Sequence, residues 1–249
     1  MKKLIGNIGI LFMVYVVGSV ARIIYLCRLM GCTRVVNPEN FPKVEPGLLI
    51  GANHSDLRDC MYEILLVGAF LYPQIARHPF KLAPWFVLDK SNFTDKWYFC
   101  WLRSSAVSVQ RGVGKSKVSE ARKITAILKN HDRILFYFPE GGRTCTVPES
   151  ALQFSAGGKK MRPFKPTLGW MVQMTKAPVF LIWTEERTAA PQQPGKPLFS
   201  WPNFKRGPIT IKFEKPMLYF EEFDTMAPAE ISKMITLRLL ELADTRSGK

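Results

Sequence analysis

An uncharged apolar segment at the amino terminus constrains most strongly what this chain can fold into. After Lys2 and Lys3, residues 4–21 contain no charged side chain. As a helix these residues would extend about 27 Å, close to the roughly 30 Å hydrocarbon core of a bilayer. The segment therefore predicts an N-terminal membrane anchor over residues 1–40, which either spans the bilayer or lies in its interface.

A cleaved signal peptide and a buried core helix are the alternatives for this segment. Ser19-Val20-Ala21 would pass as a cleavage site with small residues at both ends. However, the apolar run is longer than the usual core of a signal peptide, and a second apolar patch continues to Cys27. Basic residues flank the segment on both sides, so charge does not fix its orientation.

Composition excludes a disordered chain and favours an anionic partner. Hydrophobic residues make up 47% of the 249 residues, more than disorder allows. The five cysteines contain no C-x-x-C pair, which argues against a disulfide framework or a zinc ribbon and fits a reducing compartment. The net charge of +15 fits nucleic acid, a phosphate-bearing substrate or an acidic membrane.

Beyond residue 45, short apolar runs alternate with amphipathic stretches. We predict strands at 48–52, 86–88, 106–109, 134–138, 179–183 and 209–213. We predict helices at 60–70, 115–130, 167–175 and 229–243. This alternation predicts an α/β fold with a mixed central sheet and helical cover. Residues 143–166 and 188–208 are predicted loops, and the first is a candidate flap over a site.

The first candidate for chemistry is His54 followed by Asp59, in the pattern N-H-x-x-x-x-D between a predicted strand and a predicted helix. With His54 in the turn and Asp59 in the first helical turns, the carboxylate would hold one imidazole nitrogen and raise the basicity of the other. The alternative is a helix N-terminus capped by Ser55 or Asp56, with His54 incidental.

The second candidate is the segment Phe138-Pro139-Glu140-Gly141-Gly142-Arg143, directly after a predicted strand. A glycine pair lets the backbone approach a ligand closely, and the adjacent guanidinium offers a fork for phosphate. An ordinary strand-ending turn is the alternative.

Together, N-H-x-x-x-x-D and F-P-E-G-x-R resemble the glycerolipid acyltransferase family, which includes the 1-acylglycerol-3-phosphate acyltransferases. The resemblance covers about residues 45–220, with two weaker matches at 106–111 and 177–181. It implies a catalytic domain over residues 41–249. Two positions depart from the family pattern: Gly142 stands where Thr or Ser is usual, and Leu181 stands where a second Pro is common.

The resemblance also implies roles for particular residues. His54 would be the general base, and Asp59 would orient it and stabilise the imidazolium. Arg111 and Arg143 would bind the phosphate of the acceptor, with Glu140 shaping that site. Amides near the helix start or at the glycine pair, Gly141 and Gly142, would support the oxyanion.

The implied reaction moves a fatty acyl group from acyl-CoA or acyl carrier protein to the free hydroxyl of a lysophospholipid. The expected acceptor is 1-acylglycerol 3-phosphate and the product is phosphatidic acid, with no cofactor and no metal. We expect a phospholipid membrane as partner, at the cytoplasmic face of a bacterial inner membrane. The alternatives are another lysolipid or aminolipid acceptor, a transacylase, or a non-catalytic basic membrane-binding protein.

The remaining motifs are weaker indications of function. Residues 111–116 resemble the end of a phosphate-binding loop, but Val109 stands where that motif needs Gly. Nucleic acid is not expected as a partner, because the basic residues are dispersed and match no known module. Four basic residues near the candidate flap would be solvated or would meet acidic lipid or carrier protein: Lys159, Lys160, Arg162 and Lys165.

Overall fold

A computed structural model describes residues 2–28, 33–54, 60–109, 114–142, 144, 147–186 and 209–245. Within these residues, one sheet is built from β1 (Thr33–Val36), β2 (Leu49–Ala52), β3 (Pro84–Asp89), β4 (Ala106–Val109), β5 (Ile134–Tyr137), β8 (Val179–Glu186) and β9 (Ile209–Phe213). The strand order is β1-β9-β8-β2-β5-β3-β4. Strands β8, β2, β5, β3 and β4 run parallel, whereas β9 runs antiparallel to β8 and parallel to β1. The predicted mixed sheet is confirmed.

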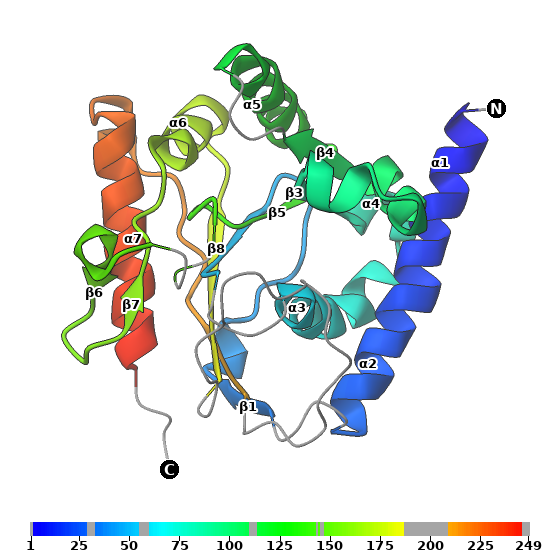
Figure 1. The fold of residues 1–249 in the computed structure, drawn as a ribbon, viewed down its shortest axis with the longest axis horizontal. Helices are drawn as coiled ribbons and strands as arrows, with labels where there is room; N and C mark the ends of the chain where they lie inside the picture. Colours follow the sequence, from blue (N-terminus) through cyan, green and yellow to red (C-terminus); the bar gives the residue numbers. More distant parts are fainter. Residues whose placement is uncertain are drawn as a thin grey trace.

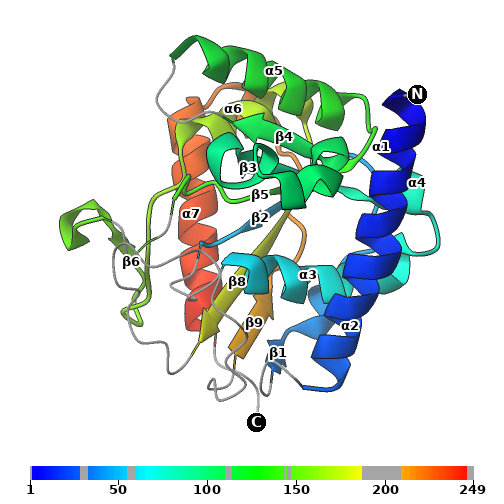
Figure 2. The ribbon, with the colours of Figure 1, turned by 45° about the vertical axis from the view of Figure 1, so that its right-hand side comes forward.

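Helices cover both faces of this sheet (Figure 1). They are α1 (Lys2–Leu11), α2 (Ser19–Leu26), α3 (Cys60–Ile75), α4 (Pro79–Leu82), α5 (Gly114–Lys129), α6 (Pro166–Thr175) and α7 (Pro228–Asp244). Side chains alternate along each strand, so Ile50 and Ile182 pack with the core on the α3 side. Leu49 and Leu181 pack with residues of α5, α6 and α7 on the opposite side. Figure 2 shows these three helices together on that side of the sheet.

The four predicted helices are present, because their apolar stripes have a sheet face to cover. In α7, Ile231, Ile235 and Leu239 are fully buried at four-residue steps. Pro228 occupies the first turn of that helix, where its missing N–H costs nothing. Helix α3 is longer than predicted and continues through Pro73 to Ile75.

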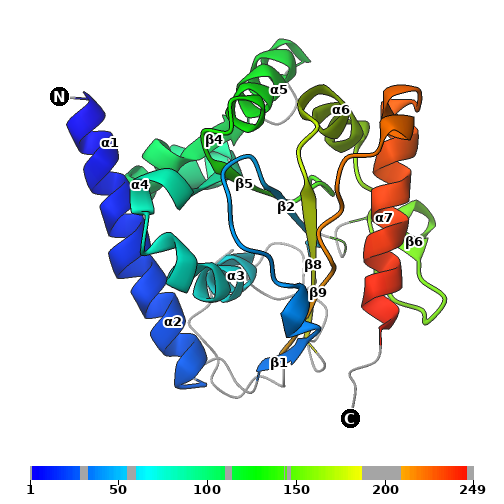
Figure 3. The same cartoon turned by 180° about the vertical axis from the view of Figure 1, so that it is seen from behind.

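The N-terminal segment is one continuous helical rod, in which a π-helical stretch (Phe12–Gly18) joins α1 to α2. It lies against α3 on the outside of the molecule (Figure 3). Pro73 has no N–H to donate to the carbonyl of Ala69, and the Arg22 guanidinium donates to that oxygen instead, at 3.2 Å. The Ser19 hydroxyl donates to the hydroxyl of Tyr72 at 2.9 Å. Polar contacts therefore fix the rod on α3.

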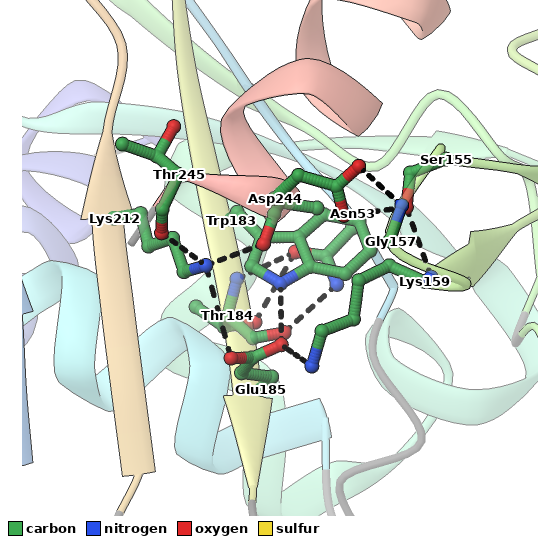
Figure 4. A network of polar contacts seen from close by, with 11 residues as sticks. Asn53, Ser155, Gly157, Lys159, Trp183, Thr184, Glu185, Lys212, Asp244 and Thr245 are labelled. Atoms are coloured by element: carbon green, nitrogen blue, oxygen red, sulfur yellow. Dashed lines mark hydrogen bonds and ion pairs between the residues drawn. The ribbon is translucent and has the colours of Figure 1, made fainter. Parts of the chain in front are cut away.

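Part of the predicted loop at 143–166 is a β-hairpin, so that prediction is wrong there. Strands β6 (Gln153–Phe154) and β7 (Lys160–Met161) pair antiparallel, and Met161 is fully buried. The Ser155 hydroxyl and the Gly157 N–H both donate to the carboxylate of Asp244, at 2.6 and 2.7 Å (Figure 4). These contacts tie the hairpin to the end of α7, a tertiary contact that local turn chemistry does not reveal. The second predicted loop, at 188–208, lies outside the described residues apart from its flanks.

Strand β1 was not predicted, and it lies within residues 1–40. It pairs with β9, with Thr33 opposite Ile209 and Val36 opposite Lys212. Four residues at the edge of a sheet give too short a pattern to be recognised in the sequence. The chain from the N-terminal rod thus enters the edge of the main sheet before β2 begins.

Candidate active site

The site lies where β2 and β5 end, at the edge of the sheet reached by the carboxyl ends of its parallel strands. These strands are neighbours, with Gly51 opposite Tyr137. His54 follows β2 by two residues and Glu140 follows β5 by three. Ligands in open α/β sheets bind at this edge. Two motifs separated by more than 80 residues are therefore brought together by one strand pairing.

Asn53 anchors the turn that carries His54. Its side-chain amide donates to the carbonyl of Thr184 at 2.9 Å, and its amide oxygen accepts from the main-chain N–H of Thr184 at 2.7 Å (Figure 4). Asn53 is 3% exposed, so both contacts are shielded from water. The asparagine extends the pairing of β2 with β8 beyond the end of the strand and fixes the backbone next to His54.

Glu140 is a second anchor for the same turn. One of its carboxylate oxygens accepts from the main-chain N–H of His54. The other accepts from the Thr144 hydroxyl at 2.8 Å and from the main-chain N–H of Arg162 at 3.0 Å. The residue is 2% exposed. Because three protein donors occupy its oxygens, this geometry favours a positioning role for Glu140.

Burial raises the pKa of Glu140 from its ordinary value of 4.5 to about 7. The hydrogen bonds from His54, Arg162 and Thr144 favour the ionised carboxylate and limit that rise. At neutral pH the protonated and ionised forms are therefore both populated. A group that is buried, fully bonded and poised near pH 7 is typical of a functional site.

The imidazole of His54 stacks on the ring of Phe138. The ring centroids are 4.9 Å apart and the planes are 29° from parallel. His54 is partly buried, whereas the neighbouring Asn53 and Glu140 are buried. The aromatic platform and the two main-chain anchors restrict where the imidazole can lie, as a general base requires.

The glycine pair forms a tight turn beneath two basic side chains. Gly141 has a φ of +66°, and its N–H closes the turn by donating to the carbonyl of Phe138 at 3.1 Å. The Lys165 side chain crosses directly over Gly141, and the Arg162 guanidinium lies against Gly142. The amide of Gly141 is thus used within the turn itself.

The structure brings four of the predicted site residues together: His54, Glu140, Gly141 and Gly142. The other three, Asp59, Arg111 and Arg143, lie outside the described residues. The elements next to them are described: α3 begins at Cys60, and β4 ends at Val109 on the same edge of the sheet as β2 and β5.

Sequence reasoning missed the anchoring role of Asn53, the platform at Phe138 and the contact of Thr144 with Glu140. Asn53 and Phe138 belong to the two motifs, but the residues that they contact are set by strand pairing. It also missed that Arg162 lies against the motif. Across the part of the chain that the structure describes, no three His, Cys, Asp or Glu residues cluster in a way that would hold a metal ion.

Comparison with known proteins agrees with the motifs. The family model described as Acyltransferase matches residues 32–185, more than half of the chain. In fold, the chain is similar to the crystal structure of the 1-acyl-sn-glycerophosphate acyltransferase PlsC from Thermotoga maritima. The TM-score is 0.56 and the sequence identity 18%, over 94% of this chain and 80% of that chain. No curated protein matches at a significant level.

Proposed function

The chain belongs to the Acyltransferase family, and we propose that it is an O-acyltransferase that acylates a lysophospholipid with His54 as general base. The acceptor we propose is 1-acylglycerol 3-phosphate, the compound named for the similar PlsC structure. The product is then phosphatidic acid. The observation that carries the proposal is the His54 imidazole, stacked on Phe138 beside the Glu140–Gly142 turn.

In the proposed reaction, His54 takes the proton from the acceptor hydroxyl as its oxygen attacks the thioester carbonyl. A carbon–oxygen bond forms and the carbon–sulfur bond breaks. The imidazolium then returns the proton to the departing thiolate, which leaves as the free thiol. Asp59 is proposed to orient the imidazole, and Arg111 and Arg143 to bind the phosphate of the acceptor.

Acyl-CoA or acyl carrier protein is the proposed acyl donor. Both carry the acyl group as a thioester on a phosphate-bearing arm, which suits a chain with a net charge of +15. No enzyme-bound cofactor takes part in the proposed chemistry, because the thioester itself is the activated acyl group.

We also propose that the N-terminal rod attaches the protein to a membrane. Residues 6–26 are long and apolar enough to cross one, and 28% of their most apolar window is buried. One stripe of the rod, at three- and four-residue steps, is exposed: Ile8, Phe12, Val16, Val20 and Ile23. Trp97, in the 3-10 segment that packs on α1, is 81% exposed. An apolar stripe with an aromatic neighbour suits an interfacial helix.

The division into an anchor over residues 1–40 and a catalytic domain over residues 41–249 stays a proposal, as does a location at the cytoplasmic face of a bacterial inner membrane. The contacts of Arg22 and Ser19 with α3 support an anchor that rests on the catalytic domain. A helix held in this way favours attachment within the interface over an independent span.

The test follows thiol release by the purified full chain in detergent, with acyl-CoA and acyl carrier protein as donors. The acceptors are lysophosphatidic acid, other lysophospholipids and glycerol 3-phosphate. We expect release that depends on lysophosphatidic acid and falls at least 100-fold in His54→Ala, in line with the loss of a general base. His131→Ala, a substitution in the turn after α5, is the matched control. Release that is insensitive to His54 would refute the general-base assignment, and no acceptor-dependent release with either donor would refute the proposed function.

A further inference from the structure

Gly142 departs from the family pattern, and the structure supplies a reason for that departure. A Cβ atom added to Gly142 would collide with a nitrogen of the Arg162 guanidinium and would lie 3.5 Å from its Cζ atom. The space that a Thr or Ser side chain would fill therefore holds the end of an arginine. In this chain a guanidinium thus occupies the space next to residue 142.

The backbone of Arg162 is fixed at this position. Its main-chain N–H donates to Glu140, on the carboxylate oxygen opposite the one that accepts from His54. Downstream, the N–H of Lys165 donates to the carbonyl of Pro139 at 3.2 Å, and the carbonyl of Lys165 accepts from the Ser232 hydroxyl at 2.9 Å. The strand end, the buried carboxylate and α7 thus hold the segment in place, and one carboxylate joins Arg162 to the turn of His54.

The guanidinium of Arg162 is the cationic group that lies against Gly142. Within the described ranges, no carboxylate forms an ion pair with it. It is partly buried and lies against the glycine turn at Gly142. The Lys165 side chain crosses the adjacent Gly141 and adds a second positive charge. A guanidinium against this turn, with a lysine side chain on the adjacent glycine, favours an anion with several acceptor oxygens, such as a phosphate.

We propose that Arg162, in the space left by Gly142, is a specificity-determining residue that binds the phosphate of the acceptor, with Lys165 adding to the positive charge at the same place. This rests on the proposed function, whose general base lies on the neighbouring turn. The guanidinium replaces the hydroxyl that the family usually has at residue 142. It makes the enzyme select acceptors with an exposed phosphate monoester over neutral or choline-bearing ones.

The kinetic test compares lysophosphatidic acid with 1-monoacylglycerol, which has the same acyl chain and hydroxyls but no phosphate. We expect Arg162→Ala to lower kcat/KM for lysophosphatidic acid about 10- to 100-fold, the effect of losing a charged hydrogen bond. The value for monoacylglycerol should change less than twofold. Arg162→Lys should recover part of the loss. Arg238→Ala, on the exposed face of α7, is the matched control and should leave both values unchanged.

A double-mutant cycle tests the coupling between residues 142 and 162. Gly142→Ala should displace the guanidinium and reduce use of lysophosphatidic acid in the same way as Arg162→Ala. Combining the two should cause little further loss, because both remove one interaction. Independent, multiplicative losses would overturn the claim that Gly142 acts by making room for Arg162.

Two further measurements distinguish acceptor binding by Arg162 from donor binding, and failure of this site from failure of the proposed function. The donor also carries phosphates, so an Arg162→Ala variant with a raised KM for acyl-CoA and an unchanged KM for lysophosphatidic acid would overturn the assignment to the acceptor. Binding of lysophosphatidic acid in detergent, measured by calorimetry, does not depend on turnover. A Kd that weakens at least tenfold in Arg162→Ala supports the site even if the wild type transfers no acyl group. An unchanged Kd refutes the site while leaving the acyltransferase proposal intact.

Discussion

The carboxyl of Glu140 accepts a hydrogen bond from the main-chain N–H of His54, although 86 residues separate the two along the chain. The contact joins the ends of two neighbouring parallel strands and fixes the turn that presents the imidazole. It is partly buried, and the same carboxyl also accepts from the Thr144 hydroxyl and from the main-chain N–H of Arg162. Glu140 is thus the point at which both sequence motifs and the downstream segment meet.

Substitution of Glu140 by Gln is expected to lower kcat more than it changes KM. The Gln side-chain oxygen can still accept from the N–H of His54. Its amide group, however, cannot accept from the N–H of Arg162, which leaves a partly buried donor without its partner at a cost of about 1 kcal/mol. We expect a drop in kcat of about tenfold or more in steady-state assays. Unchanged kcat in a folded variant would show that the contact does not position the imidazole.

The raised pKa of Glu140 makes stability depend on pH in a defined direction. Well below pH 4.5 the carboxyl is protonated in both the folded and the unfolded chain. Between pH 4.5 and about 7 the unfolded chain releases the proton while the folded chain retains it. The free energy of unfolding therefore falls with rising pH, by about 3 kcal/mol in all, and levels off above pH 7. Thermal unfolding of wild type and Glu140→Gln from pH 5 to 8 should give curves that converge or cross, and parallel curves would contradict the shift.

Asn53→Ala is expected to destabilise the fold and reduce activity together. The substitution leaves the N–H and the carbonyl of Thr184 without their buried partners, at a total cost of about 2–5 kcal/mol. It also frees the backbone beside His54, so kcat should fall even where the variant is fully folded. Chemical denaturation and single-turnover assays measure the two effects. Asn130→Ala, at the exposed end of α5, is the control and should change neither.

Substitution of Lys212 is expected to destabilise the fold without changing the rate of the reaction. Its ammonium is buried, donates to the carbonyls of Ala243 and Thr245 at the end of α7, and lies 3.9 Å from the carboxylate of Glu185 (Figure 4). Lys212→Met should lower the free energy of unfolding by about 2–4 kcal/mol, because two carbonyls and a carboxylate lose a buried donor. At a temperature where the variant remains folded, kcat should match the wild type. A selective loss of kcat would give Lys212 a role in the reaction.

The exposed stripe of the N-terminal rod predicts membrane affinity. Replacing Phe12, Val16 and Val20 by Asp should reduce co-sedimentation with vesicles of phosphatidylglycerol and phosphatidylethanolamine at least tenfold, because each charge must enter the interface. The same assay with Arg238, Lys233 and Leu237 replaced by Asp on α7 is the control. Equal loss in both variants would assign binding to charge alone, and no loss in the first would remove the rod from the membrane contact.

The sequence predicted the principal elements because their signals are local. Residues 106–109 and 209–213 were predicted as strands with the same bounds that the structure gives, and the helices at 115–130 and 229–243 differ from it by one residue at each end. The hairpin of β6 and β7 was missed, since two-residue strands carry no periodicity and are held by contacts with Asp244.

The sequence by itself determined the family, the general-base candidate and the position of the glycine turn, because motif spacing and residue type are properties of the chain alone. The tertiary structure decided what surrounds these residues. The pairing of β2 with β5 brings Glu140 to His54, and burial there raises the pKa of the carboxyl. The path of the chain after the hairpin lays Arg162 against Gly142. Long-range packing creates these relationships, and neither charge nor spacing along the sequence encodes them locally.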